Sequence, residues 1–465
     1  MSAPVIWIFT PMLAGVIIFW FNRYRRISLA VGIVVMGLLA GLAWKLPIGV
    51  TFHIGSLSIR LSDSFALLGR HFTLGASSNG LLIFLYLMAG AWFIGALVID
   101  VNRLFPSLAL GIVSLLVAAV MFEPFLYAAL LIEMAILLSL PLLVPPGTAL
   151  GQGVVRYLIF QTLAMPFILF TGWMLTGLEA GISDPGLTLR AAILLGLGFA
   201  FLLAIFPFFS WVPLLTEQYE PYIAGFLLIM LQTVALLFAA KFIDQYTWLR
   251  DNPVLYQVLR IAGTLTMVTG GIMAAFQAHL GRIFGFAVIF ETGISLLALS
   301  QIPEGGMGSF VLLFIPRMLT FILWGLCLSI LKQECGGLDF RQIQRTGRSD
   351  PFLAGCAIFA NLSMVGLPLF AAFPARLALW QTLIQQSPLS AIWGLISLIG
   401  LLASAIRAAT ALFEGEGWNV HGVVSWPQAF LLGISLLSIL ILGSQPQQIF
   451  LSAMNMANAY PHILP

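Results

Sequence analysis

Charge is the scarcest property of this sequence. Aspartate, glutamate, lysine and arginine make up 8% of the 465 residues, whereas hydrophobic residues make up 61%. A soluble domain carries about a quarter charged residues, and no polar segment here is long enough to hold a catalytic domain, so a soluble-type enzyme is disfavoured. The net charge of +3 is too small to indicate a nucleic-acid partner. The mean hydropathy of +1.06 instead indicates an all-α polytopic membrane protein.

Metal-binding side chains are also scarce. The three cysteines, Cys327, Cys335 and Cys356, form no CxxC pair, and the five histidines are scattered without metal-ligand spacing. Isolated cysteines of this kind are usually small core residues. We therefore expect no metal site, no cofactor and no catalytic residue in this chain.

Apolar runs predict about fourteen transmembrane helices in one transmembrane domain covering 1–465. The first run continues into an arginine cluster without a small-residue cleavage site, so no cleavable signal peptide is expected. The longest connection contains Val50–Ser62, whose partial alternation in polarity predicts an extracytoplasmic hairpin. The expected spans are 4–20, 28–45, 80–98, 106–121, 125–144, 156–176, 188–206, 222–243, 257–275, 283–300, 309–331, 353–371, 390–413 and 427–445.

Lysine and arginine predict the orientation of these helices. They gather in the odd-numbered connections, which the positive-inside rule places in the cytoplasm. Both termini are then expected on the outer side of a bacterial inner membrane. The residues in or beside odd connections are Arg23, Arg25, Arg26, Arg103, Arg156, Arg282, Lys332, Arg341, Arg345 and Arg348, against Arg60, Arg70 and Arg250 in even ones.

Two of the expected helices are interrupted by proline. FPFFSWVP contains Pro207 and Pro213, and GLPLFAAFPAR contains Pro368 and Pro374. Each break lies late in its own half of the bundle, which is typical of two inverted-topology repeats with one broken helix each. Ordinary proline kinking is the alternative, because proline is common in membrane helices. The repeats would cover about 106–243 and 257–413.

A few charged residues fall inside the apolar runs. Glu133 is the only charge in Phe125–Val144 and lies roughly 12 Å along that helix, near the midplane of a hydrocarbon core of about 30 Å. An acid there costs about 2.5–3.5 kcal/mol on insertion scales, so such residues usually have a function. Glu291 is the only charge in its helix, and Arg376 follows the second break. These three are the candidates for a proton pathway.

Each candidate also has a structural interpretation. Glu133 could be a buried, protonated, hydrogen-bonded acid, and Glu291 could bond a neighbouring helix or broken backbone. Arg376 could satisfy carbonyls freed by the second break. Arg317 and Arg407 are interpreted as links between helices, or as side chains that reach the membrane surface.

Lysine is almost absent from the helices. Lys45, Lys241 and Lys332 all fall near helix ends. This scarcity matters because a buried lysine can give up its proton, whereas arginine effectively cannot.

Four segments carry a family resemblance. They are QAHLGRIFGFAVIFETG (Gln277–Gly293), SMVGLPLFAAFPAR (Ser363–Arg376), FPFFSWVPLLT (Phe206–Thr216) and LLIEMAILLSLPLL around Glu133. Together, in their order along the chain, they resemble the antiporter-like subunits of respiratory complex I. That family also includes subunits of Mrp-type cation/proton antiporters and of membrane-bound hydrogenases. Fourteen helices with two broken ones fit the same resemblance.

The resemblance implies a mid-membrane row of charged residues that passes protons. Most of that row is missing here, since only Glu133 and Arg376 keep a charge at its positions. Without the usual lysine partner, Glu133 is expected to hold its proton much of the time. Placed by motif, the family's lysine and histidine positions are Leu202 on helix seven, Gln232 on helix eight, Gly281 after helix nine, and Pro316 and Thr320 on helix eleven.

These expectations lead to one favoured function and several alternatives. We predict a non-catalytic membrane-arm subunit of a complex I-type, proton-translocating oxidoreductase, in contact with other membrane-arm subunits and the lipid bilayer. Its depleted row predicts weak or absent pumping. One alternative is active translocation by a rearranged route through Glu133, Glu291 and Arg376. Others are a subunit of a Mrp-type antiporter or a membrane-bound hydrogenase, and a stand-alone cation/proton antiporter, which the lost row positions disfavour.

Overall fold

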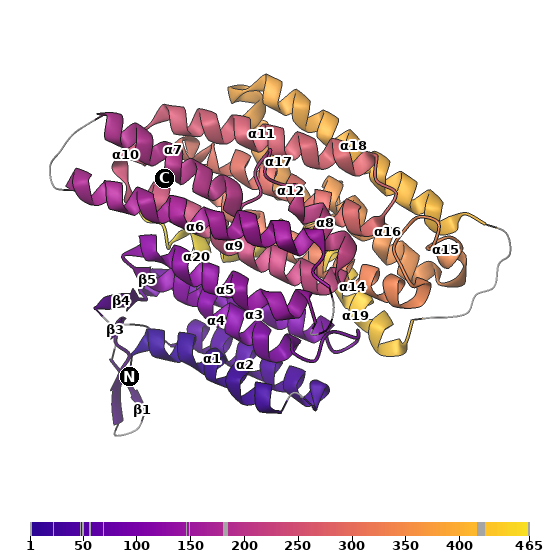
Figure 1. Cartoon of the computed structure of the whole chain (residues 1–465), viewed down its shortest axis with the longest axis horizontal. Coiled ribbons are helices and arrows are strands. Elements are labelled where there is room, and N and C mark those ends of the chain that lie inside the picture. Colours follow the sequence, from indigo (N-terminus) through magenta and orange to yellow (C-terminus); the bar gives the residue numbers. More distant parts are fainter. Residues whose placement is uncertain are drawn as a thin grey trace.

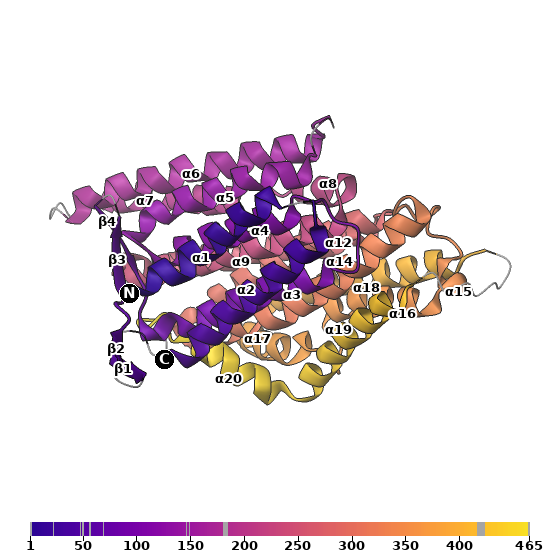
Figure 2. The same cartoon turned by 90° about the horizontal axis from the view of Figure 1, so that it is seen from below.

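The computed structural model describes residues 2–463 except 22, 47, 49–50, 55–56, 68, 146, 148, 180–184 and 416–423. Its long helices run along one common direction and form a single bundle (Figure 1). Both chain ends lie at the same end of this bundle in two perpendicular views (Figure 2), as an even number of membrane crossings requires.

The described residues confirm every expected span. Ten helices are long and apolar enough to cross a membrane, and four shorter apolar helices, α3, α4, α7 and α16, account for the remaining spans. The fourteen helices are α1 (Ala3–Trp20), α2 (Arg25–Lys45), α3 (Asn79–Gly95), α4 (Phe105–Met121), α5 (Ala128–Leu143), α6 (Gln152–Glu179), α7 (Pro185–Leu202), α9 (Pro221–Gln245), α11 (Pro253–Ala275), α12 (Leu280–Leu299), α14 (Phe314–Cys335), α16 (Pro351–Val365), α18 (Pro388–Phe413) and α19 (Trp426–Ser444).

Proline begins many of these helices. Pro221, Pro253 and Pro351, for example, are the first residues of α9, α11 and α16. Proline suits this position because the first helical N–H has no partner inside the helix, and the fixed φ angle is already helical. Shorter helices lie between or after the spans: α8 (Trp211–Gln218), α10 (Thr247–Arg250), α13 (Met307–Leu312), α15 (Thr346–Ser349), α17 (Ala372–Gln386) and α20 (Pro446–Ala457), with 3-10 turns η1 (Ala76–Ser78), η2 (Phe125–Tyr127) and η3 (Ile302–Glu304).

The eleventh span differs from its prediction as one continuous helix. It is divided into α13 and α14 at Leu313. Pro316 lies four residues after Leu312 and has no N–H, so the Leu312 carbonyl cannot receive its usual helical hydrogen bond. The interruption follows from this missing bond.

Five short strands lie at the end of the bundle that holds the chain ends (Figure 1). β1 (Thr51–Ile54) pairs antiparallel with β2 (Leu57–Arg60), which confirms the expected hairpin. A second sheet, β3 (Ser64–Leu67), β4 (Arg70–Thr73) and β5 (Phe122–Glu123), was not predicted. It joins the connection after α2 to the connection after α4.

The two helix breaks match each other. The first separates α7 from α8 and contains Pro207, with Pro213 as the third residue of α8. The second separates α16 from α17 and contains Pro368, with Pro374 as the third residue of α17. The predicted broken helices are therefore confirmed, and both breaks are more than simple kinks.

Among the ten helices long enough to cross a membrane, the most buried are α9, α12 and the α13–α14 span, with 94%, 94% and 83% of their apolar stretch buried, against 11% for α19. α11 packs closely against α12 because Gly293 lies where a side chain would meet the backbone of Met267. Such close backbone approach through glycine is typical of helices that pack inside membranes. The centre of the bundle is thus formed by helices that present few side chains to lipid.

Ion pairs between connections agree with the predicted arrangement of the spans. Odd-numbered connections should all lie on the same side of the membrane. Each of three ion pairs joins two odd-numbered connections, as this arrangement requires. Which side faces the cytoplasm stays a prediction. The pairs are Arg25–Asp100, Arg282–Glu217 at 2.7 Å and Lys332–Glu220 at 4.0 Å.

A buried aspartate holds the segment after α20. Asp244 at the end of α9 is 1% exposed and accepts the backbone N–H of His462 at 2.8 Å. Its other oxygen lies 3.2 Å from the His462 ring and 3.3 Å from the Gln245 side-chain amide. This carboxylate therefore ties His462 to the C-terminal end of α9, and the Tyr460 hydroxyl adds a bond to the Leu237 carbonyl at 3.1 Å.

We expect Asp244→Ala to loosen this segment at a cost of about 1.5–3 kcal/mol, because the His462 N–H loses a hydrogen bond to a charged acceptor. Hydrogen exchange measured by mass spectrometry should show faster exchange at residues 458–463. Asp251→Ala, at an aspartate whose side chain is 76% exposed at the same end, is the control and should leave that exchange unchanged. Equal protection in both variants would contradict the assignment.

Candidate functional site

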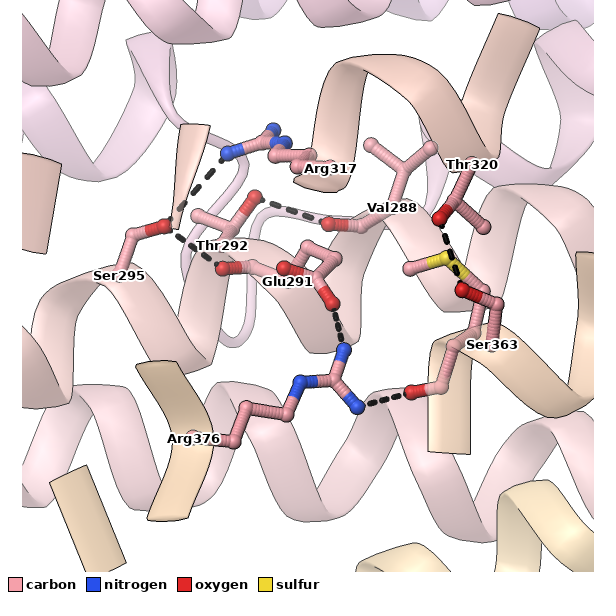
Figure 3. Close-up of polar contacts among 9 residues, drawn as sticks. Val288, Glu291, Thr292, Ser295, Arg317, Thr320, Ser363 and Arg376 are labelled. Atoms are coloured by element: carbon pink, nitrogen blue, oxygen red, sulfur yellow. Dashed lines mark hydrogen bonds and ion pairs between the residues drawn. The ribbon is translucent and has the colours of Figure 1, made fainter. Parts of the chain in front are cut away.

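A buried ion pair closes the second break. Arg376, on α17, bonds the Glu291 carboxylate, on α12, and both side chains are 3% exposed. The other terminal nitrogen of Arg376 donates to the carbonyl of Met364 in the last turn of α16 (Figure 3). The guanidinium also lies 5.3 Å from the ring centre of Phe290. The structural interpretations of Glu291 and Arg376 are thus confirmed, while a role of either in proton movement stays a prediction.

The arrangement around Arg376 is electrostatically consistent. A helix C-terminus carries partial negative charge and unsatisfied carbonyls, and Arg376 meets one of these at the end of α16. Two opposite charges in a low-dielectric interior are tolerated only when their geometry and remaining hydrogen bonds are good. The pair therefore joins three elements, α12, α16 and α17, at the break.

Arg317 is a second buried cation that links helices, which confirms one of its two interpretations; the other, a side chain that reaches the membrane surface, is wrong. It lies on α14 and is 2% exposed, whereas Arg407 is exposed and bonds the Ala275 carbonyl. Arg317 donates to the Gln232 side-chain oxygen at 2.5 Å and to the Ser295 hydroxyl at 3.5 Å. Ten residues into the α13–α14 span, its guanidinium is too deep to reach the surface. Its depth in the apolar run, and its place beside Pro316, are the sequence features that could have indicated a buried arginine.

Neutral polar groups complete this cluster. The Thr292 hydroxyl lies 3.2 Å from the same Gln232 oxygen, and the Ser295 hydroxyl donates to the Glu291 carbonyl at 2.9 Å. At the family's second helix-eleven position, the Thr320 hydroxyl pairs with that of Ser363 on α16 at 2.9 Å (Figure 3). Gln232 therefore accepts a hydrogen bond where the family resemblance expects a lysine, which would donate one.

Glu133 lies in a separate site in the first half of the bundle. Its side chain, on α5, is buried, and one carboxylate oxygen accepts the Thr162 hydroxyl of α6 at 2.8 Å. The other oxygen has no hydrogen-bond partner among the described residues. Glu133 lines a small cavity together with Gln161 and Leu202. Leu202 therefore stands beside Glu133, where the family resemblance expects a lysine.

The two breaks are capped by different chemistry. The Gln161 side-chain amide donates to the Leu202 carbonyl, the last residue of α7, at 3.1 Å. At the second break, the Met364 carbonyl is met by the Arg376 guanidinium instead. A neutral amide thus satisfies the first freed carbonyl and a permanent cation the second.

Gly281 occupies another family lysine position, at the start of α12. A side chain there would come too close to the Thr216 carbonyl of α8, so a lysine could not enter without a shift. Burial lowers the pKa of the neighbouring His279 imidazole. A neutral ring can accept the Gly281 N–H at its Nδ1, 3.1 Å away. Position 281 therefore serves to begin α12, with its N–H capped by His279, and it carries no charged side chain.

The two halves therefore differ in what they can do chemically. Arginine effectively does not release its proton, so Arg317 and Arg376 are fixed charges. Lys241 and Lys332 instead bond the carbonyls of Val120 and Tyr219 near helix ends.

Among the described residues no group of three histidine, cysteine, aspartate or glutamate side chains could hold a metal ion. Glu133 remains the one buried acid in the row without a described cationic partner.

Comparisons with known proteins agree with this fold. A family model described as NADH:quinone oxidoreductase/Mrp antiporter, transmembrane, matches residues 155–406, more than half of the chain. NADH-quinone oxidoreductase subunit N of Moorella thermoacetica is 26% identical over 287 residues, which are 59% of this chain and 58% of that protein. The matched region thus spans less than two thirds of that relative's length.

Two solved structures share the fold over nearly the whole chain. One is from the Mrp complex of Dietzia sp. DQ12-45-1b, with a TM-score of 0.79, 18% identity, and coverage of 99% of this chain and 98% of that one. The other is from respiratory complex I of Thermus thermophilus with bound NADH, with a TM-score of 0.77, 20% identity, and coverage of 99% and 100%. At these identities the likeness concerns the fold alone.

Proposed function

The chain belongs to the NADH:quinone oxidoreductase/Mrp antiporter family of membrane proteins, and from that membership we propose that it is a membrane-arm subunit through which few or no protons pass. The parent assembly is a complex I-type oxidoreductase, because curated relatives such as that of Moorella thermoacetica are named as its subunits. The sites for electron donor and quinone lie in other chains. A Mrp-type complex is an alternative parent, since a subunit of one shares this fold, and a membrane-bound hydrogenase is another, from the family resemblance.

The single observation that carries the proposal is the chemistry of the buried row. A proton relay needs groups that both take up and release protons. Of the described residues in the row, Arg376 is a fixed cation, and Gln232 and Leu202 cannot titrate; Arg317, beside the row position Pro316, is a second fixed cation. Glu133 has no described cation beside it that would draw off its proton. The scaffold of the family is thus present, while most of the relay is not.

We place the chain in a bacterial inner membrane with both termini outside. Its lateral faces would contact lipid and neighbouring membrane-arm subunits. Thr162, which bonds Glu133, is exposed on one such face. A neighbouring subunit on that face would cover Thr162 and, behind it, Glu133, the buried acid that has no described cationic partner.

Glu133→Gln in the intact complex is the decisive experiment. Protons moved per electron should be unchanged within error, because the depleted row does not carry them. Glu123→Gln, at an exposed glutamate after α4, is the matched control. A large fall in protons per electron, with electron transfer intact, would refute the weak-pumping proposal. Co-purification of the tagged chain with an NADH-oxidising, hydrogenase or antiporter partner identifies the parent complex independently of pumping.

A second candidate is translocation by a rearranged route through Glu133, Glu291 and Arg376. One observation favours it: the buried Glu133 and Gln161 oxygens and the Gln232 nitrogen have no partner among the described residues. Buried polar atoms of this kind are commonly bridged by water. On this route, Glu133→Gln and Glu291→Gln would both lower the protons moved per electron.

A further inference from the structure

Four arginines line one cavity at the end of the first two spans. Arg23, Arg25 and Arg26 follow or begin these helices, and Arg103 comes from the connection between α3 and α4. The cavity has a volume of about 440 Å³ and is larger than one phosphate group needs. Asp100 is the one acidic residue in its lining.

Only one of these arginines is neutralised within the described chain. Arg25 bonds both the Asp100 carboxylate and the Ile99 carbonyl. Arg23, Arg26 and Arg103 are exposed, and no ion pair or hydrogen bond joins their side chains to other described residues. The cavity therefore has an excess of three guanidinium groups that present donors to an anion.

The rim of this cavity is apolar and aromatic. Tyr24 and Ile27, 59% and 63% exposed, line the cavity, and Trp20 and Phe21 at the end of α1, 81% and 62% exposed, precede its arginines in the chain. Tryptophan and tyrosine at the ends of membrane helices lie at the level of the lipid headgroups. The guanidinium groups are thus placed at headgroup depth, with apolar side chains beside them on the bilayer side.

We propose that this cavity binds the phosphodiester headgroup of an anionic glycerophospholipid, with the acyl chains along the exposed face of α1 and α2. The headgroup phosphate is held by Arg23, Arg26 and Arg103, while Asp100 orients Arg25. Clusters of basic residues immediately beside a transmembrane helix are suited to anionic lipid headgroups. The apolar rim favours a lipid over free phosphate or an acidic protein segment. The proposal is independent of whether the chain pumps protons.

Native mass spectrometry of the full chain, released from nanodiscs of phosphatidylglycerol and phosphatidylcholine, tests the site. The unaltered chain should retain phosphatidylglycerol selectively. The triple variant Arg23→Gln, Arg26→Gln, Arg103→Gln should retain it about a hundredfold less, as expected for three interfacial arginines. The control variant Arg156→Gln, Arg190→Gln, Arg341→Gln removes the same charge from exposed positions elsewhere and should retain it normally.

Three results would overturn the proposal. The first is an equal loss of phosphatidylglycerol in the triple and control variants, at matched thermal stability. The second is displacement of the bound lipid by inorganic phosphate at an equal concentration, which would indicate a free-phosphate site. The third comes from Arg26→Cys in the intact complex: cross-linking to a neighbouring chain, with none to photoactivatable phosphatidylglycerol, would mean that a protein covers the cavity.

Discussion

Arg376→Met is expected to destabilise the chain by about 3–5 kcal/mol. It leaves the Glu291 carboxylate buried without its cation, which is the costly way to break a buried ion pair. It also leaves the Met364 carbonyl at the end of α16 without the guanidinium that now meets it. The free energy of unfolding in detergent, measured for the full chain, reports this cost. Arg407→Met, at an exposed arginine with one bond to a backbone carbonyl, should change it little.

The partner substitution separates charge from packing. Adding Glu291→Gln to Arg376→Met removes the stranded charge, so most of the lost stability should return. Glu291→Gln alone should be destabilising, because it leaves Arg376 as the uncompensated buried charge. If the double variant is as unstable as the sum of the two single variants, the two side chains do not act as a pair.

Leu202→Lys is expected to depend strongly on Glu133. Leu202 lines the same cavity as Glu133, so the new ammonium group would face the carboxylate oxygen that has no described partner. Adding Glu133→Gln strands this lysine in the interior and should cost a further 3–5 kcal/mol or so. A double-mutant cycle on the free energy of unfolding measures that coupling.

The neighbouring residue supplies the control for this cycle. Leu203 is fully buried but does not line the cavity of Glu133. Leu203→Lys should therefore be destabilising to the same extent with either residue at position 133. A cycle at position 202 with no more coupling than at position 203 would show that Leu202 is not the cation position of the row.

The sequence alone predicted the spans and breaks because their signals are local. Apolar runs long enough to cross a bilayer, and prolines that remove a backbone donor, act within one turn or one helix. The β3–β5 sheet was missed because β5 is two residues long and pairs with a segment far away in the chain. Strands of four, four and two residues are too short to show a recognisable alternation of polar and apolar residues.

The site was only partly predictable for the same reason. Glu133, Glu291 and Arg376 stand out as single charges in apolar surroundings. Arg317 was undervalued because its acceptor, Gln232, is 85 residues away and neutral. A neutral amide gives no sign in the sequence that a cation will lie against it, and only the meeting of α9 and α14 shows the pairing.

The unequal charges of the two halves have an electrical consequence. Glu291 and Arg376 are opposite charges in contact, so a membrane voltage that displaces them together moves no net charge. A proton that reaches Glu133 near the midplane crosses about half of the field, so 100 mV changes its binding free energy by about 1.1 kcal/mol. The ratio of protonated to unprotonated Glu133 would then change roughly sevenfold. Voltage therefore acts on the first half of the bundle through one proton, whereas the Glu291–Arg376 pair of the second half offers it no proton to move.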